Sequence, residues 1–211
     1  MLDTKVEPWQ RSNLQVFWSE LAPSDHIVQI YENDKVFLDS LEGFAGSGIL
    51  AGEAVILIAT KEHLRAIRER LENHGFDIAS LIASDRFIGL EATETLSKFM
   101  VNNWPDEQLF FETVKAVFER AQRNSRKVRA FGEMVALLWQ AGLNDATVQL
   151  ENLWNQFHRK GAFSLFCAYP KKGFIKDVSA SIHTICCEHS KVIDGSPRPS
   201  TEIYYQTVNL S

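Results

Sequence analysis

The residues of this chain best placed to do chemistry are polar groups at the ends of predicted strands. Glu133 follows residues 127–132, an apolar and aromatic run that predicts a strand buried on both faces. Ligands of open α/β sheets bind at the carboxyl ends of the strands. A carboxylate there is costly to bury without a cation, a metal or water. Glu133 is therefore a candidate ligand-binding residue, and the simpler alternative is that it caps the next helix and pairs with a surface arginine.

The same reasoning assembles a candidate ligand site at one edge of the predicted sheet. An apolar pocket with a few convergent polar groups is typical of small-molecule sites. We expect Glu133 and Tyr169 to orient the ligand and Tyr31 and Trp139 to wall the pocket, whereas Trp154 belongs to an apolar helical stripe and is expected in the core. The predicted ligand-binding set is Tyr31, Glu32, Thr60, Glu133, Trp139 and Tyr169.

A metal site is a second possibility that the spacing raises. His183, Cys186 and His189 recur at three-residue steps in a helix predicted from Asp177, and Cys167 on a strand could complete a tetrahedral set. The paired-ligand spacing of structural zinc sites is not seen, and buried thiols commonly behave as small hydrophobes. We therefore interpret Cys167 as a small buried hydrophobe with an inert thiol, and we predict no metal and no cofactor.

A phosphate-binding loop would need glycines and a lysine between the first strand and its helix. That junction is Tyr31-Glu-Asn-Asp-Lys35, which is acidic and has no glycine. Gly46, Gly48 and Gly52 come after the helix without Lys-Ser or Lys-Thr, so we assign them to a turn. The sequence thus predicts a fold without a P-loop.

Strands and helices alternate along the chain, which predicts an α/β fold of three layers, with a mainly parallel sheet and helices on both faces. Strands are expected at 26–31, 54–59, 86–90, 127–133, 162–169 and 201–208. Helices are expected from residues 34, 61, 93, 105, 146 and 177, the third of them reaching residue 103. We divide the chain into an aromatic leader (1–24), a main domain (25–194), and a linker with a final strand (195–211).

Composition and charge limit the classes of function. The chain of 211 residues is 45% hydrophobic and 23% charged, as in globular proteins, and its net charge of −5 argues against nucleic-acid binding. Basic residues between 120 and 129 cluster at a predicted helix end, where they are expected to be solvated. Three cysteines, two of them adjacent, favour a reducing compartment over a disulfide framework. With no signal peptide and no apolar run of membrane-spanning length, we predict a cytoplasmic protein.

Six motifs, in this order, resemble those of the MEDS domain, the methanogen and methylotroph sensory domain first described in the dichloromethane-responsive repressor. The resemblance spans roughly residues 24–195. The motifs are His26-Ile-Val-Gln-Ile-Tyr-Glu-Asn-Asp34, Gly52-Glu53 before a strand, Arg129-Ala-Phe-Gly-Glu-Met-Val135, Leu150-Glu-Asn-Leu-Trp-Asn155, Leu165-Phe-Cys-Ala-Tyr-Pro170 and Ile185-Cys-Cys-Glu-His-Ser190.

The resemblance implies a RecA/KaiC-like fold with a degenerate nucleotide loop, in which Glu133 falls near the acidic residue of the metal-binding strand. It also implies a sensory module that binds small organic, including hydrocarbon-derived, ligands and accompanies histidine kinases or DNA-binding regulators. We therefore predict a non-enzymatic sensor, with the homodimer as one arrangement, that relays to a separate signalling protein, either a histidine kinase or a transcription regulator. Two alternatives stay open: a remnant nucleotide-binding or ATPase-like protein, and a ligand-free interaction module.

Overall fold

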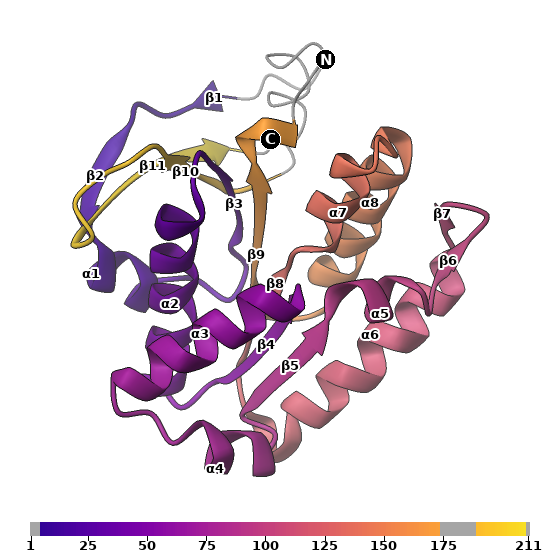
Figure 1. The fold of residues 1–211 in the computed structure, drawn as a ribbon, viewed down its shortest axis with the longest axis horizontal. Helices are drawn as coiled ribbons and strands as arrows, with labels where there is room; N and C mark the ends of the chain where they lie inside the picture. The colour runs from indigo at the N-terminus through magenta and orange to yellow at the C-terminus, as the bar shows by residue number, and fades with distance from the viewer. Residues whose placement is uncertain (1–4, 174–188, 210–211) are drawn as a thin grey trace.

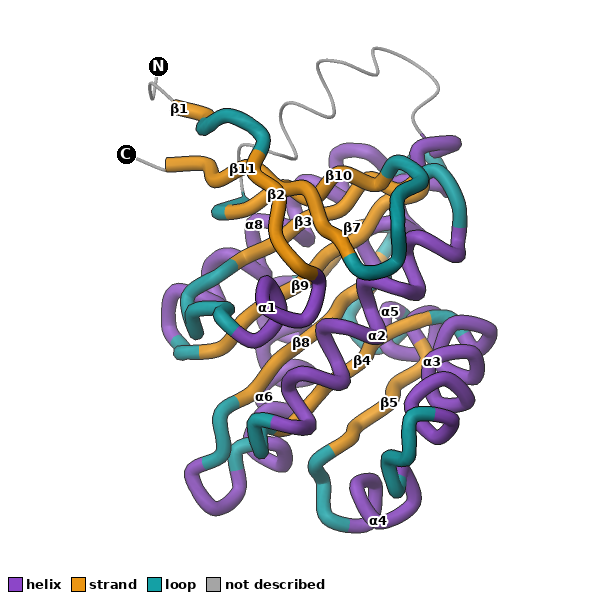
Figure 2. The backbone as a smooth tube through the Cα atoms, turned by 90° about the vertical axis from the view of Figure 1, so that its left-hand side faces the viewer, coloured by secondary structure: helices purple, strands orange, loops and turns teal. Residues whose placement is uncertain are grey.

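The centre of the molecule is a nine-stranded mixed sheet with helices on both faces (Figures 1 and 2). The computed structural model describes residues 5–173 and 189–209. The strands lie in the order β1-β11-β10-β3-β9-β8-β4-β5, and β2 also pairs with β11. The neighbours from β10 to β5 are all parallel, whereas β1, β2 and β10 are antiparallel to β11. The predicted α/β class with a mostly parallel sheet is confirmed.

The strands of the main sheet are β1 (Lys5–Val6), β2 (Gln10–Asn13), β3 (His26–Tyr31), β4 (Ala54–Ala59), β5 (Phe87–Glu91), β8 (Val128–Gly132), β9 (Phe163–Pro170), β10 (Lys191–Gly195) and β11 (Glu202–Asn209). A separate hairpin contains β6 (Met100–Val101) and β7 (Trp104–Pro105). The helices are α1 (Leu14–Ser19), α2 (Asp34–Leu50), α3 (Lys61–Asn73), α4 (Ile78–Ala83), α5 (Ala92–Leu96), α6 (Glu107–Ala121), α7 (Met134–Gln140) and α8 (Asn144–Lys160). Two short 3-10 turns are η1 (Arg123–Ser125) and η2 (Lys171–Gly173).

Two hydrophobic cores, one on each side of the sheet, make this a three-layer structure. Every residue of β4 is buried, as expected of a continuous apolar run in the middle of a parallel sheet. The side chains of β4 alternate between the cores: Ile56 packs with α5, α6, α7 and α8, while Leu57 packs with α1, α2, α3 and α4. None of the helices within residues 5–173 and 189–209 has the length and apolar content that crossing a bilayer would require.

Gly46 and Gly48 correct the predicted turn, because both lie inside α2. Only Gly52, with φ of +78°, occupies the turn that follows the helix. A Cβ at Gly48 would come within 2.8 Å of Cδ of Arg129 and 3.2 Å of Cγ2 of Val55. The glycine therefore lets Arg129 cross between α2 and the sheet.

Arg129 itself departs from the prediction of a solvated basic cluster. Its side chain is 2% exposed and forms an ion pair with Glu53. It also donates to the carbonyl oxygen of Trp18 at 2.7 Å and that of Phe44 at 3.3 Å. One buried guanidinium thus joins α1, α2 and β8.

The helix predicted to run to residue 103 is wrong beyond α5. The chain instead turns back as the β6–β7 hairpin, with Asn102 and Asn103 at φ of +51° and +62°. Two consecutive residues with positive φ are typical of a tight hairpin turn. Apart from glycine, asparagine is the residue that tolerates this conformation best. Pro105 ends the hairpin, and α6 begins at Glu107 with Asp106 as its N-cap.

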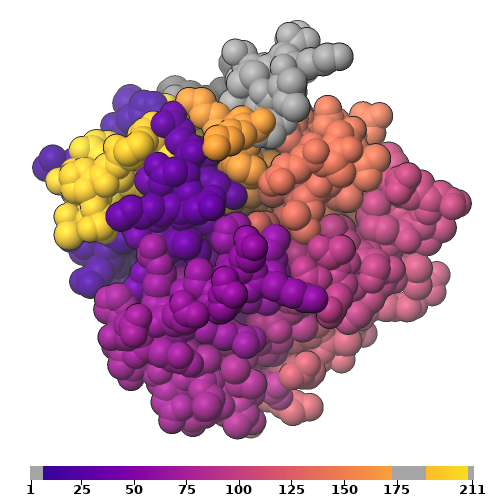
Figure 3. All heavy atoms as spheres, viewed as in Figure 1, coloured from indigo at the N-terminus to yellow at the C-terminus, as the bar shows by residue number. Residues whose placement is uncertain are grey.

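Both ends of the chain extend the sheet beyond the predicted elements. The final strand is confirmed as β11, but β10 was missed: its residues belonged to the end of the main domain and the linker in the prediction. The helix predicted from Asp177 falls in residues 174–188, outside the described part. The leader forms β2 and α1, which buries Phe17 and Trp18, and β2 pairs with β11. In the space-filling view the indigo N-terminal residues lie against the yellow C-terminal ones (Figure 3).

Candidate functional site

Glu133 lies at the carboxyl end of β8 with its carboxylate fully engaged. One oxygen, Oε2, accepts a hydrogen bond from the backbone N–H of Thr60 at 2.8 Å, and Oε1 lies 2.8 Å from Nδ1 of His63. The residue occupies the N-cap position of α7 without a capping hydrogen bond from its side chain. Within the described residues its carboxylate contacts Thr60 and His63 rather than the end of α7 or a surface arginine, so the simpler sequence interpretation is wrong.

His63 is the member of this site that sequence reasoning missed. Thr60 caps α3 by accepting from the N–H of His63 at 3.3 Å, which fixes the imidazole in the first turn of the helix. Burial lowers the pKa of His63, but the hydrogen bond and charge of Glu133 outweigh it, so the pKa lies above its usual value. Protonation of His63 is therefore favoured by its contact with Glu133. The sequence did contain a signal for His63. Thr60 is recognisable as an N-cap, and a cap at that position places His63, three residues later, beside the strand ends.

Tyr31 joins the same group from the end of β3. Its ring stacks on Phe37 with centroids 4.8 Å apart, and Phe37 packs edge-on against His63 at 4.9 Å. Burial, followed by the negative charges of Glu133 and Asp34, raises the pKa of Tyr31, so its hydroxyl stays protonated. Tyr31, Thr60 and Glu133 are thus brought together as predicted, with Phe37 and His63 added. These five residues are called the rim cluster below.

The other three predicted residues lie apart from the rim cluster. Glu32 forms a surface ion pair with Lys171 at 2.7 Å. Tyr169 pairs with Ile30 in the β3–β9 register, so it points to the face opposite that of Tyr31. On that face Trp139 packs edge-on against Tyr169 with centroids 6.4 Å apart. The expected convergence therefore holds for the strand ends but not for the side chains, which are divided between the two faces.

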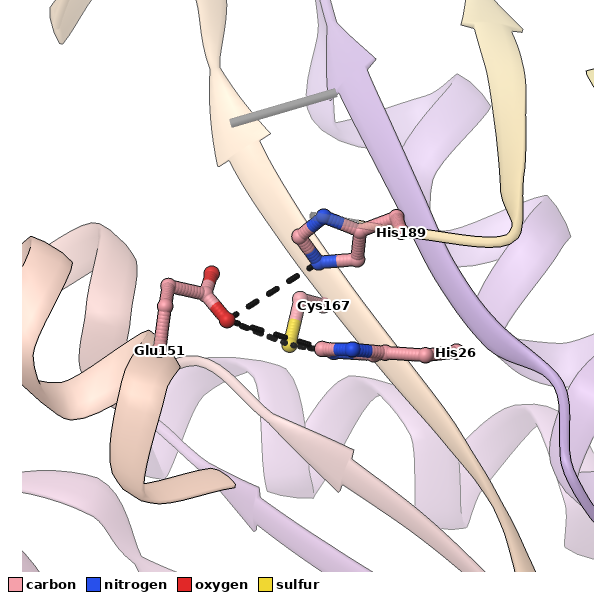
Figure 4. A group of neighbouring side chains, drawn as sticks. All are labelled: His26, Glu151, Cys167 and His189. Atoms are coloured by element: carbon pink, nitrogen blue, oxygen red, sulfur yellow. Dashed lines mark hydrogen bonds and ion pairs between the residues drawn. The ribbon is translucent and has the colours of Figure 1, made fainter. Parts of the chain in front are cut away.

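A second group of polar side chains is buried beneath α8 (Figure 4). It consists of His26, Glu151, Cys167 and His189, whose potential ligand atoms all lie within 4.8 Å of one another. These four residues are called the buried cluster below.

The members of the buried cluster come from four parts of the chain. His26 opens β3 and Cys167 is in β9, where Cys167 pairs with Val28, so both side chains share one face. Glu151 reaches them from α8, and His189 lies two residues before β10. Each of the four is no more than 5% exposed.

Hydrogen bonds around the buried cluster determine the orientation of its groups. Nδ1 of His26 lies 2.8 Å from Oδ1 of Asn155, an acceptor, so Nδ1 carries the proton and Nε2 presents its lone pair to the cluster. The hydroxyl of Tyr169 donates to Oε1 of Glu151 and leaves Oε2 facing the histidines.

Burial and neighbouring charge decide the ionisation of two members of the cluster. Burial, together with His189 and His158, lowers the pKa of His26 well below its usual value, so the ring is neutral. Burial and the charge of Glu151 raise the pKa of the Cys167 thiol.

The buried cluster alters the interpretation of the cysteine and histidine pattern. Cys167 and His189 are brought together as that pattern required, while His183 and Cys186 lie outside the described residues. Cys167 belongs to the hydrophobic core, yet its sulfur also lies 3.6 Å from Nε2 of His26, a polar neighbour that the sequence did not reveal. His26 and Glu151 were missed because no local spacing connects them with Cys167.

A groove elsewhere on the surface contains none of the predicted ligand residues. It has a volume of about 1280 Å³ and runs between α1, the ends of α2 and α3, and Thr201. Its apolar side chains include those of Leu14, Leu50 and Phe76, and Asp39 and Glu42 supply negative charge.

Comparison with protein families gives a match over most of the chain. The family described as MEDS, the methanogen/methylotroph, DcmR sensory domain, matches residues 25–189. This range includes the rim cluster and all four residues of the buried cluster. No curated protein matches the chain.

Proposed function

We propose, from the premise that this chain belongs to the MEDS family of sensory domains, that it senses a small organic molecule at the rim cluster. Membership of the family gives the sensory role. The identity of the site, the class of ligand and the relay to a partner are our proposal. The chain acts in it as a receptor without catalysis, on a RecA/KaiC-like scaffold, and passes its signal to a separate histidine kinase or transcription regulator.

The observation that carries this proposal is the Glu133–His63 pair beside an aromatic wall. A partly buried ion pair offers one strong acceptor and one strong donor, whereas the stacked rings of Tyr31 and Phe37 offer apolar surface. A few placed polar groups in mostly apolar surroundings are typical of sites for small ligands. A ligand with an apolar body and one hydrogen-bonding group fits this chemistry.

The same pair provides a route for the signal. His63 is in the first turn of α3, and Glu133 directly precedes α7, which lies on the opposite face of the sheet. A ligand group that replaces one partner uncouples the starts of these two helices. Since a ligand shifts a conformational equilibrium only by its differential affinity for the two states, breaking the contact is the step that links binding to the partner.

A thermal-shift screen tests the proposal directly. Small alcohols, carboxylates, halogenated hydrocarbons and nucleotides are added to the wild-type chain and to His63→Gln and Glu133→Gln. The matched control is Glu119→Gln, which removes an exposed ion pair with Lys115 on α6. We expect an organic compound to raise the Tm of the wild type and the control but not of the two rim variants. Equal shifts in all four proteins would place the binding elsewhere.

The screen also separates the two alternatives. A nucleotide-binding remnant is favoured only by the position of Glu133 at the end of β8, and the β3–α2 junction supplies Asn33 as a helix cap rather than a glycine loop. Stabilisation by ATP that Glu133→Gln abolishes would revive that alternative. A ligand-free interaction module would show no shift with any compound, together with a self-association that the edge of the sheet mediates.

A further inference from the structure

We propose that the core beneath α8 contains a site for one divalent transition-metal ion of the zinc class, formed by His26, Glu151, Cys167 and His189. This site is separate from the rim cluster and does not depend on the proposed sensing of an organic ligand. Its four ligand types are those found in zinc sites: imidazole nitrogen, thiolate sulfur and carboxylate oxygen.

The separations of these atoms fit ligands of a common ion better than direct hydrogen bonds. Oε2 of Glu151 lies 3.9 Å from Nε2 of His26 and 3.8 Å from Nε2 of His189. A hydrogen bond between such atoms spans about 2.7–3.2 Å. Two ligands on a tetrahedral zinc ion, with bonds of about 2.0 Å to N or O and 2.3 Å to S, stand roughly 3.3–3.6 Å apart.

The sulfur completes the same arrangement. Sγ of Cys167 lies 3.6 Å from Nε2 of His26 and 4.0 Å from Oε2 of Glu151. Closing these separations onto an ion takes a few tenths of an ångström, and the other pairs of ligand atoms, which lie within 4.8 Å of one another, close by as much as about 1.5 Å. The rings of His26 and His189 have centroids 4.0 Å apart and planes inclined by 44°.

Charge balance gives a second reason. An ion inside the protein core is costly unless the charges of its ligands balance its own. A divalent cation bound by one carboxylate, one thiolate and two neutral imidazoles makes a site with no net charge. Binding as a thiolate therefore displaces the thiol proton of Cys167.

The residues around the ligands orient them as outer residues do in metal sites. Asn155 accepts from Nδ1 of His26 and leaves Nε2 free to coordinate. Tyr169 donates to Oε1 of Glu151, which leaves Oε2 as the single coordinating oxygen. Hydrogen bonds of this kind fix the tautomer of the histidine and the geometry of the carboxylate. They give Tyr169 a role different from the one predicted for it.

The mixed ligand set and the burial decide the type of ion and of site. The carboxylate disfavours Cu(I), and the thiolate disfavours Mg²⁺ and Ca²⁺. Four protein ligands leave no open position, as in structural rather than catalytic zinc sites. The ion fastens α8 and the start of β10 to β3 and β9, so its occupancy is expected to stabilise this side of the sheet.

The experiment is a metal titration of the full chain, purified without a histidine tag and stripped with a chelator. Co²⁺ replaces Zn²⁺ as the probe, because a thiolate on tetrahedral cobalt gives a charge-transfer band and strong visible bands. We expect saturation at one equivalent, displacement by Zn²⁺ and a rise in Tm with Zn²⁺. Absence of any band and of any Zn²⁺-dependent shift would overturn the proposal.

Variants distinguish this site from adventitious binding. Cys167→Ala should abolish the charge-transfer band of bound Co²⁺. Glu151→Gln keeps the shape of the side chain and should weaken Co²⁺ binding. Circular dichroism verifies that both variants fold. Tyr169→Phe should weaken binding by about 10–100-fold while keeping the band, as for an orienting residue. The thiol control is the double variant Cys186→Ser/Cys187→Ser, which should keep the band. Retention of the band in Cys167→Ala, or its loss in the control, would contradict the assignment.

Discussion

Replacing Glu133 by glutamine should destabilise the protein in acid and leave it nearly unchanged in base. Glutamine keeps the size of the side chain and can still accept from the N–H of Thr60. It cannot form an ion pair with protonated His63, whose Nδ1 lies 2.8 Å from the carboxylate. The effect therefore isolates one charged interaction at the rim cluster.

The magnitude follows from the type of hydrogen bond that is lost. A hydrogen bond to a charged group contributes about 1.5–3 kcal/mol, and a neutral one about 0.5–1.5 kcal/mol. The folded pKa of His63 is raised above its unfolded value, so the stabilisation is fully present below the unfolded pKa of about 6.5 and is lost as pH rises through the folded pKa. We expect a loss of about 2 kcal/mol at pH 5.5 and less than about 1 kcal/mol at pH 9.

Urea unfolding followed by tryptophan fluorescence measures both values, and an NMR titration of His63 in the wild type and the variant gives the direction of the pKa change. The pKa of His63 should fall in the variant, because burial then acts without the opposing charge. Exposed Glu119→Gln is the control for a general change in surface charge. Equal losses at the two pH values, or a larger loss at pH 9, would refute the charged pair.

Three further substitutions test how the chain is held together, each by the midpoint and slope of urea unfolding. Arg129→Met should lower the free energy of unfolding by about 3–5 kcal/mol, because it leaves a carboxylate and two carbonyl oxygens without the guanidinium that they contact. A loss below about 1 kcal/mol would contradict the structural role of this buried guanidinium. Gly48→Ala should cost about 1–3 kcal/mol, since the new Cβ comes within 2.8 Å of the Arg129 side chain, and a neutral result would mean that α2 shifts freely. Ile203→Ala should lower the free energy of unfolding by about 2–5 kcal/mol, because Ile203 is fully buried in β11. The control Val148→Ala, at an exposed position, should change it by no more than about 0.5 kcal/mol. Similar losses for both variants would count against β11 as part of the core.

The parallel core of the sheet was predictable because its signal is local. A run such as 54–59, apolar at every position, is buried on both faces and needs no knowledge of its neighbours. The position of Glu133 was predictable for a similar reason, since a polar residue directly after such a run lies at the edge where strands end. The β6–β7 hairpin was missed, although Asn102-Asn103 is a turn signal, because the residues before it continue a helical pattern.

The buried cluster could not be derived in the same way. Its geometry depends on the register of β3 against β9 and on the side of α8 that faces the sheet, and neither is encoded in a local spacing. Glu151 appears in the sequence as one charged residue beside an apolar stripe, and His26 as the first residue of a strand. The split of Tyr31 and Tyr169 between two faces has the same origin, because a one-residue difference in register reverses the direction of a side chain.

The pairing of β2 and β1 with β11 also sets an order of assembly. The first strands of the chain receive their neighbour only when residues 202–209 have been synthesised, so this edge closes after the parallel centre can already form. Contacts between residues so far apart in the sequence form slowly. Until they form, the unpaired edges of these strands can pair wrongly with other chains. Trp18, which is buried between α2 and β9 beside these strands, is a built-in fluorescent reporter of that last step.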